Sequence, residues 1–152
     1  MAKLDLGSNE KLIIGLAIAG IVIYVLYTLF YARKPKENEI TVSILHPDQG
    51  ARLSVYLPHE FSVAVYNRTN SRIRTWIGCS IRHINHSTWY DFPAKQVTPA
   101  GNADVRVSWW LAPHPARDTG QWIMRTSAWD EYPSPAANRL ASHEIRFYFH
   151  LI

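Results

Sequence analysis

The sequence predicts an all-β antiparallel sandwich of about seven strands, preceded by one transmembrane α-helix. Two observations lead to this fold class. Residues 12–32 hold no charged side chain, and from residue 40 onward short alternating segments are separated by Pro, Gly, Asn and Asp. Strands that recur every 8–12 residues or so, with turn signals between them, are typical of sandwiches and barrels. Beyond the apolar stretch the sequence shows no helical periodicity.

The apolar stretch over residues 12–32 is long enough for a helix that crosses a hydrocarbon core of roughly 30 Å. Arg33 and Lys34 follow it directly. A cleavable signal peptide is the alternative, but its apolar core is normally about 7–15 residues long and is followed by a small-residue cleavage site. We therefore predict an N-terminal tail (1–11), a transmembrane helix (12–32), a linker (33–39) and one β-sandwich domain (40–152).

The strands of the domain follow from alternation, because every second side chain of a strand lies on the same face. We predict strands, in order, over residues 40–44, 53–57, 61–66, 72–84, 105–111, 120–129 and 143–152, with a short edge piece at 89–92. The apolar set of the later strands is expected to face the core. Its members are Phe61, Val63, Val65, Ile73, Ile77, Cys79, Ile81, Val105, Val107, Trp109, Leu111, Trp122, Met124, Thr126, Ala128, Ile145, Phe147, Phe149 and Leu151.

The strand pair over residues 105–110 and 120–130, closed by an apolar last strand, resembles immunoglobulin-like modules of the fibronectin type III or CARDB kind in prokaryotic surface proteins. The resemblance covers residues 40–152. It implies a seven-stranded sandwich used for adhesion, spacing or subunit contact. The paired cysteines of antibody domains are missing, since Cys79 is the only cysteine of the sequence, so antigen-type binding is not implied.

Two observations bear on which side of the membrane the domain lies, and they point in opposite directions. Lys3 and Lys11 precede the apolar stretch while Arg33, Lys34 and Lys36 follow it, which slightly favours a cytoplasmic domain. The resemblance favours the opposite side, and long domains translocate largely regardless of charge. We therefore expect a single-pass membrane protein with an extracytoplasmic domain, either periplasmic or at the cell surface.

Composition and motifs exclude several classes of function. A net charge of +4, dispersed along the chain, is too weak for a nucleic-acid footprint. No P-loop, G-x-S-x-G, H-E-x-x-H or C-x-x-C motif is present, so we expect no enzyme, no cofactor and no small-molecule substrate. The closest histidine pair, His83 and His86, would converge only across a turn, and a metal- or redox-active protein built on it is disfavoured. Asp130 and Glu131 fit a turn cap better than a calcium site.

Basic and aromatic residues recur together on the outward faces of the predicted strands. If these strands were neighbours, Arg and Trp side chains would interleave as cross-strand cation–π pairs. Such a face is either a protein interface, where Trp and Arg form hot spots, or a ladder that only stiffens the domain. The candidate interface residues here are Arg74, Trp76, Arg106, Trp110, Arg125 and Trp129.

The apolar stretch has a contact face of its own. Gly15 and Ala19 are small residues four positions apart, a spacing that lets a second helix approach closely, and the Tyr24 hydroxyl favours a partner over lipid. We predict a non-catalytic accessory subunit whose helix and immunoglobulin-like domain pack against a larger membrane complex, by analogy of the respiratory or photosynthetic type. Its partners would be the membrane and other integral membrane subunits. The alternative is a stand-alone anchored module that binds carbohydrate or peptide through Trp110 and Trp129.

Overall fold

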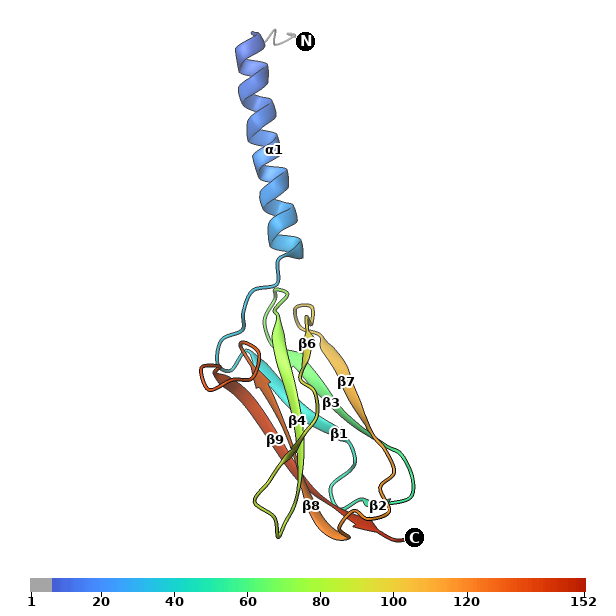
Figure 1. The fold of residues 1–152 in the computed structure, drawn as a ribbon. Coiled ribbons are helices and arrows are strands. Elements are labelled where there is room, and N and C mark those ends of the chain that lie inside the picture. The colour runs from blue at the N-terminus through green and yellow to red at the C-terminus, as the bar shows by residue number, and fades with distance from the viewer. Residues whose placement is uncertain (1–6) are drawn as a thin grey trace. The chain divides into compact units, whose positions relative to one another are not determined.

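The computed structural model describes residues 7–152, without the side chains of residues 8, 10 and 28–30. The chain divides between Ala32 and Arg33 into two compact units. The first contains a helix, α1 (Ser8–Phe30), and the second contains the strands (Figure 1). From Lys11 to Tyr27 the side chains of α1 are exposed on every side of the helix.

One sequence-based prediction about α1 is wrong. Within the part of the chain that the structure describes, no helix combines the length and the apolar character that crossing a membrane requires. This finding overturns the transmembrane helix predicted over residues 12–32, and with it the full predicted fold class, the single-pass membrane protein and its localisation with an extracytoplasmic domain. Residues 1–6 of the predicted tail lie outside the described residues.

The second unit is a β-sandwich. Its strands are β1 (Ile40–His46), β2 (Arg52–Ser54), β3 (His59–Asn67), β4 (Thr75–His83), β5 (Tyr90–Asp91), β6 (Lys95–Val97), β7 (Asp104–Leu111), β8 (Gly120–Trp129) and β9 (Arg139–His150). Among the described residues they form one sheet in the order β1-β3-β7 and a larger sheet in the order β2-β9-β8-β4-β5, with β6 also paired to β4. The pairings are antiparallel except that β2 runs parallel to β9.

The core lies between the two sheets. Phe61 of β3 meets Phe147 of β9 edge to face, with ring centroids 5.6 Å apart, and meets Phe92 at 5.5 Å. The predicted inward residues are buried in the core, apart from Val105, which is half-buried, and Leu151, which is 57% exposed. Leu151 lies beyond the end of β9, where alternation no longer applies. The predicted sandwich and its strand phases are otherwise confirmed.

The outward face of β8 differs from the prediction. Ile123 and Ser127 are buried although alternation places them on the outer side of the sheet. Ile123 lies between Arg82 of β4 and Arg146 of β9 in the strand register. Long arginine stems cover apolar surface while their charged ends stay in water, which accounts for the burial of Ile123. Ser127 belongs to the site described below.

Two turns are held by side chains. Asn67, at the end of β3, is fully buried and donates to the carbonyl oxygens of Ser71, Pro99 and Ala100 at 2.8, 3.2 and 2.9 Å. Its Oδ1 accepts the Thr69 backbone N–H at 2.9 Å. In the hairpin between β8 and β9, the Asp130 carboxylate accepts from the backbone and side chain of Asn138 at 2.8 and 2.9 Å. The predicted turn-capping role of Asp130 is confirmed.

Candidate functional site

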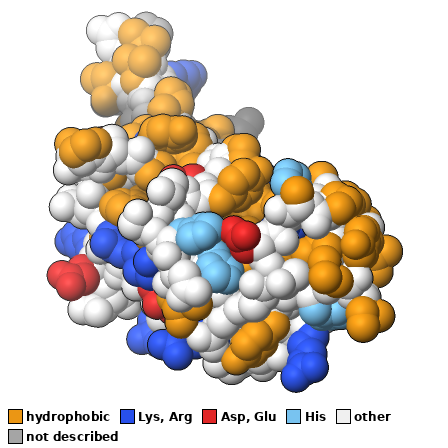
Figure 2. Space-filling model, turned by 60° about the horizontal axis from the view of Figure 1, so that its bottom comes forward, with side chains coloured by type: hydrophobic (Ala, Val, Ile, Leu, Met, Phe, Trp, Pro, Cys, Tyr) orange, Lys and Arg blue, Asp and Glu red, His pale blue; other side chains and the backbone are white. Residues whose placement is uncertain are grey.

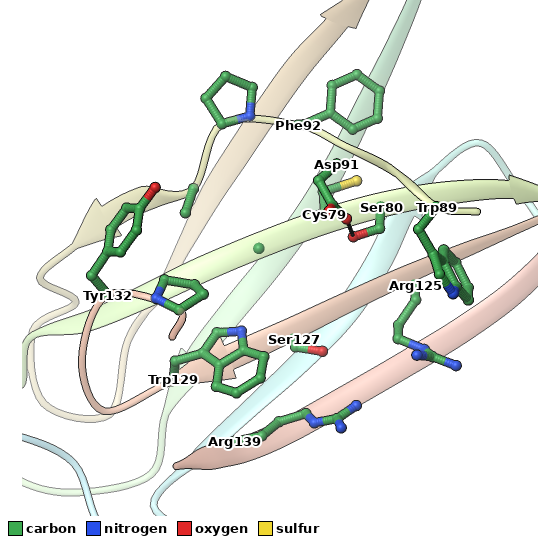
Figure 3. A pocket seen from close by; sticks show the side chains of 14 residues that line it. Cys79, Ser80, Trp89, Asp91, Phe92, Arg125, Ser127, Trp129, Tyr132 and Arg139 are labelled. Carbon is green, nitrogen blue, oxygen red and sulfur yellow. Dashed lines mark hydrogen bonds between the residues drawn. The ribbon is translucent and has the colours of Figure 1, made fainter. Parts of the chain in front are cut away.

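A groove of about 630 Å³ lies on the outer face of the larger sheet (Figure 3). We call it the aromatic groove. It is formed by β4, β5 and the residues beside it, β8, the hairpin after β8 and the start of β9. Its lining consists of Gly78, Cys79, Ser80, Trp89, Asp91, Phe92, Pro93, Ala94, Arg125, Ser127, Trp129, Tyr132, Pro133 and Arg139.

Small residues make the floor of the aromatic groove. Gly78 of β4 stands opposite Ser127 of β8, and the next outward residue of β4 is Ser80. None of the three carries a side chain larger than a hydroxymethyl group, so the outer surface of the sheet is low at this point. Larger residues stand at both ends, which is why the face is hollow there rather than flat.

Aromatic rings form the two ends of the groove. At one end, the guanidinium carbons of Arg125 and Arg82 lie 4.4 and 5.0 Å from the Trp89 ring centroid. At the other end, the Arg139 guanidinium carbon lies 5.4 Å from the Trp129 ring. Figure 3 shows Trp89 and Trp129 on opposite sides of Ser127. Each cation–π contact of this exposed kind contributes about 0.5–1 kcal/mol and restricts the indole it covers.

Charges in the groove are unevenly compensated. The Arg125 Nε donates to Glu144 Oε2 at 2.5 Å, and Asp91 Oδ1 accepts from the Ser80 hydroxyl at 2.6 Å. Arg139 takes part in no ion pair among the described residues. The groove therefore presents one uncompensated guanidinium beside Trp129, together with a carboxylate and hydroxyl groups at the other end.

The structure brings together only part of the predicted interface. Trp76 and Trp129 stand opposite each other on β4 and β8, and Arg125 lies on the same face. Arg74 is exposed just before β4, and its backbone N–H donates to the Arg33 carbonyl oxygen at 2.8 Å. Trp76, Trp129 and Arg125 therefore belong to the larger sheet, and Arg74 lies next to it.

Two other candidates lie on the smaller sheet. Arg106 and Trp110 are on β7, which pairs with β3 in the smaller sheet. They therefore lie on the outer face opposite to the one that carries Trp76, Trp129 and Arg125. Arg106 donates to Glu60 at 3.0 Å, and Trp110 is 68% exposed. The condition that these strands are neighbours is thus not met, and the candidate Arg and Trp residues are divided between two outer faces. Gly15, Ala19 and Tyr24 are exposed on α1.

Several residues that line the aromatic groove were not among the candidate residues predicted from the sequence. Trp89 and Tyr132 lie outside regular strands, where alternation assigns no face. Arg139 begins β9 four residues before its predicted start. Tyr132 packs edge to face on Trp76, with ring centroids 5.1 Å apart. The dense run Trp129, Asp130, Glu131, Tyr132 was the one local signal that this turn carries a contact surface.

Cys79 and the pair His83 and His86 were considered for redox or metal chemistry, and of these only Cys79 lines the aromatic groove. Burial raises the pKa of the Cys79 thiol to about 12, and the Asp91 carboxylate adds to the shift. His83 and His86 do converge, with ring centroids 5.0 Å apart, because the chain turns at Ile84 and Asn85. Within the described residues, however, no group of three or more metal-ligating side chains is suitably placed to hold a metal ion.

Comparison with known proteins defines the fold. No protein-family model and no curated protein matches this chain. A CARDB domain from Pyrococcus furiosus is similar to it, with 16% identity over 78% of this chain and 100% of that domain and a TM-score of 0.51. At this identity the likeness concerns the fold alone. It confirms the predicted resemblance to a CARDB-like, immunoglobulin-like β-sandwich.

Two larger proteins contain a similar substructure. A β-glucosidase from Listeria innocua in complex with glucose matches with 10% identity over 72% of this chain, at a TM-score of 0.47. An alkylpurine DNA glycosylase from Pseudomonas fluorescens, bound to DNA containing an abasic site analogue, matches with 12% identity over 72% of this chain, at a TM-score of 0.48. The chain spans only 16% of the first protein and 30% of the second.

Proposed function

We propose that this chain is a non-catalytic accessory subunit whose β-sandwich binds a partner protein through the aromatic groove. The observation that carries the proposal is the pairing of Trp89 and Trp129 with arginines around a floor of small residues. Trp, Tyr and Arg are the residues that most often dominate binding energy at protein interfaces, and they do so in hollows that exclude water.

The geometry of the groove suits a rigid contact. Arg125 is held between Trp89 and Glu144, and Tyr132 is held against Trp76. Side chains that are already fixed before binding lose less conformational freedom when a partner arrives. Arg139 lacks an acidic partner among the described residues, so an acidic group of the bound protein has a place beside Trp129.

The helix supports the same proposal independently. Leu12, Leu16 and Ile23 are at least 63% exposed, and apolar side chains continue around the helix. Apolar side chains that lie exposed together normally mark a surface that contacts another molecule. A Cβ placed on Gly15 would meet nothing within 4 Å, so this position is open to the close approach of a partner helix. We propose a partner helix, packed against Gly15 and Ala19, as the second contact.

The test is quantitative co-purification of the full-length tagged chain, followed by identification of the chains retained with it. Trp129→Ser and Trp89→Ser should each weaken retention by about thirtyfold, corresponding to the roughly 2 kcal/mol of a hot spot. Trp110→Ser is the matched control, because Trp110 is more exposed but lies on the other sheet. If Trp110→Ser no longer retains the partner chains while Trp89→Ser and Trp129→Ser do, the interface lies on β7 instead.

The helix contact is tested separately. The double variant Gly15→Leu, Ala19→Leu raises apolarity but prevents close helix approach, so it should release partners bound through α1. Ala17→Leu is the control, since Ala17 lies on the opposite side of the helix from Gly15 and Ala19. Equal retention by the double variant and the control would remove α1 from the interface.

A module that binds carbohydrate or peptide is the second candidate function. It is favoured by one observation: exposed aromatic rings and the hydrogen-bonding groups Asp91, Ser80 and Arg139 line the same groove. Titration with glycans and short peptides, followed by tryptophan fluorescence, distinguishes the two functions when wild type is compared with Trp129→Ser. A saturable change that Trp129→Ser abolishes supports the module, and silence across the series removes it.

A further inference from the structure

A second, smaller hollow of about 240 Å³ lies at the end of the domain where β7 ends and β8 begins. It shares no lining residue with the aromatic groove. Ile81, Leu111 and Trp122 line it, and all three are buried residues of the core. Figure 2 is turned toward this end of the domain and shows apolar and histidine side chains at its surface. The hollow is therefore an opening into the apolar interior.

Arg117 gives this apolar hollow a positive charge. Its guanidinium carbon lies 4.8 Å from the Phe149 ring centroid, and its Nη2 donates to the Ala112 carbonyl oxygen at 3.3 Å. Its Nη1 is buried and has no hydrogen-bond partner among the described residues. The ion pairs of the described residues also leave Arg117 out. The guanidinium thus lines the pocket with one donor unused and no counter-charge.

This arrangement favours a bound acceptor. Arg117 as a whole is half-buried, but its buried donor loses the hydrogen bond it would make to water. Burial accordingly lowers the pKa of Arg117, although a guanidinium stays charged in proteins. A carboxylate supplies the missing acceptor and the missing counter-charge together, in a geometry that the guanidinium fork matches.

We propose that this pocket binds a small monocarboxylic acid with an apolar tail. The carboxylate pairs with the Arg117 guanidinium, and the tail lies against Ile81, Leu111 and Trp122. At about 30 Å³ for each water-sized group, the pocket holds a molecule of about eight non-hydrogen atoms. Hexanoate has this size and chemistry. The inference is independent of the aromatic groove and of any protein partner.

The experiment is calorimetric titration of the full chain with hexanoate, acetate, hexan-1-ol and inorganic phosphate. Hexanoate should bind with one-to-one stoichiometry. Acetate lacks the tail and hexan-1-ol lacks the charge, so each should bind at least tenfold more weakly, and phosphate should not bind. Equal binding of hexanoate and hexan-1-ol would overturn the role of Arg117. Equal binding of phosphate would show a general anion site and overturn the proposal.

Variants and one further ligand complete the test. Arg117→Gln should weaken hexanoate binding at least tenfold, and Arg117→Lys should weaken it less. Arg106 is an exposed arginine on β7, so Arg106→Gln is the control and should leave hexanoate binding unchanged. Unchanged affinity in Arg117→Gln would overturn the proposal. If that variant does not fold, the four-ligand series on the wild-type chain decides alone. Glycyl-leucine tests a peptide carboxyl terminus, and tighter binding of this dipeptide than of hexanoate would overturn the assignment to a free small acid.

Discussion

The Trp129 indole lies beside Gly78 on the neighbouring strand, so that a Cβ at Gly78 would meet Trp129 Nε1 at 3.5 Å. That distance is an ordinary van der Waals contact. The position therefore accepts one methyl group, and a longer side chain would extend over the floor of the aromatic groove. Gly78 keeps the floor low at the point where Trp129 forms the end of the aromatic groove.

Gly78→Leu should fill the groove while leaving the sandwich folded. We expect partner or ligand binding to fall by at least thirtyfold and the melting temperature to change little, because the added side chain lies on the outer face of the sheet. Gly78→Ala is the control and should bind normally. Co-purification and thermal unfolding measured on both variants check this. Normal binding by Gly78→Leu would show that the groove is not the contact surface.

Phe147→Ala should cost about 3–5 kcal/mol of the free energy of unfolding, as large aromatic truncations in cores do. Phe147 is fully buried and contacts Phe61 and Phe149, whose ring centroids lie 5.6 and 5.3 Å away. Trp122→Ala should behave similarly. Tyr148→Ala, the outward neighbour, should cost less than about 1 kcal/mol. Unfolding by guanidinium chloride measures all three, and equal costs for Phe147 and Tyr148 would contradict the strand phase.

Asn67→Asp should destabilise the domain by at least about 2 kcal/mol, although the two side chains have the same shape. An ionised carboxylate cannot donate to the three carbonyl oxygens that Asn67 Nδ2 now satisfies. Asn67→Ala should cost a similar amount for the same reason. Asn85→Asp, in an exposed turn, is the control. Urea unfolding gives the comparison, and matching midpoints for Asn67→Asp and wild type would refute the network.

Cys79 should make stability fall at alkaline pH. Its thiol pKa rises from 9.0 in the reference state to about 12 in the fold, so the unfolded chain releases this proton first. The contribution of the buried thiol is fully present below pH 9 and is lost as the pH rises toward 12. The free energy of unfolding should therefore decline between pH 8 and pH 11 more steeply in wild type than in Cys79→Ala. Parallel declines would show that the thiol ionises normally.

The sequence predicted the sandwich core well because alternation is a local property. Phe61, Val63 and Val65 are fully buried, as their spacing indicates. Sheet membership depends instead on pairing between distant strands, which alternation does not encode. Arg106 and Trp110 were grouped with Arg125 and Trp129 on this account, although β7 pairs with β3 and not with β8. Trp89 and Tyr132 lie outside regular strands, so no pattern assigned them to the groove.

The parallel pairing of β2 with β9 has a consequence for biosynthesis. Arg52, Leu53 and Ser54 align with Tyr148, Phe149 and His150, so β2 must wait for a partner that the ribosome makes much later. β9 also lies between β2 and β8 in the larger sheet. Contacts between segments so far apart in sequence close slowly, and unpaired strand edges are prone to association in the meantime. The nascent domain therefore has a period of vulnerability during translation, in which a chaperone or an early-bound partner would raise the yield of folded chain.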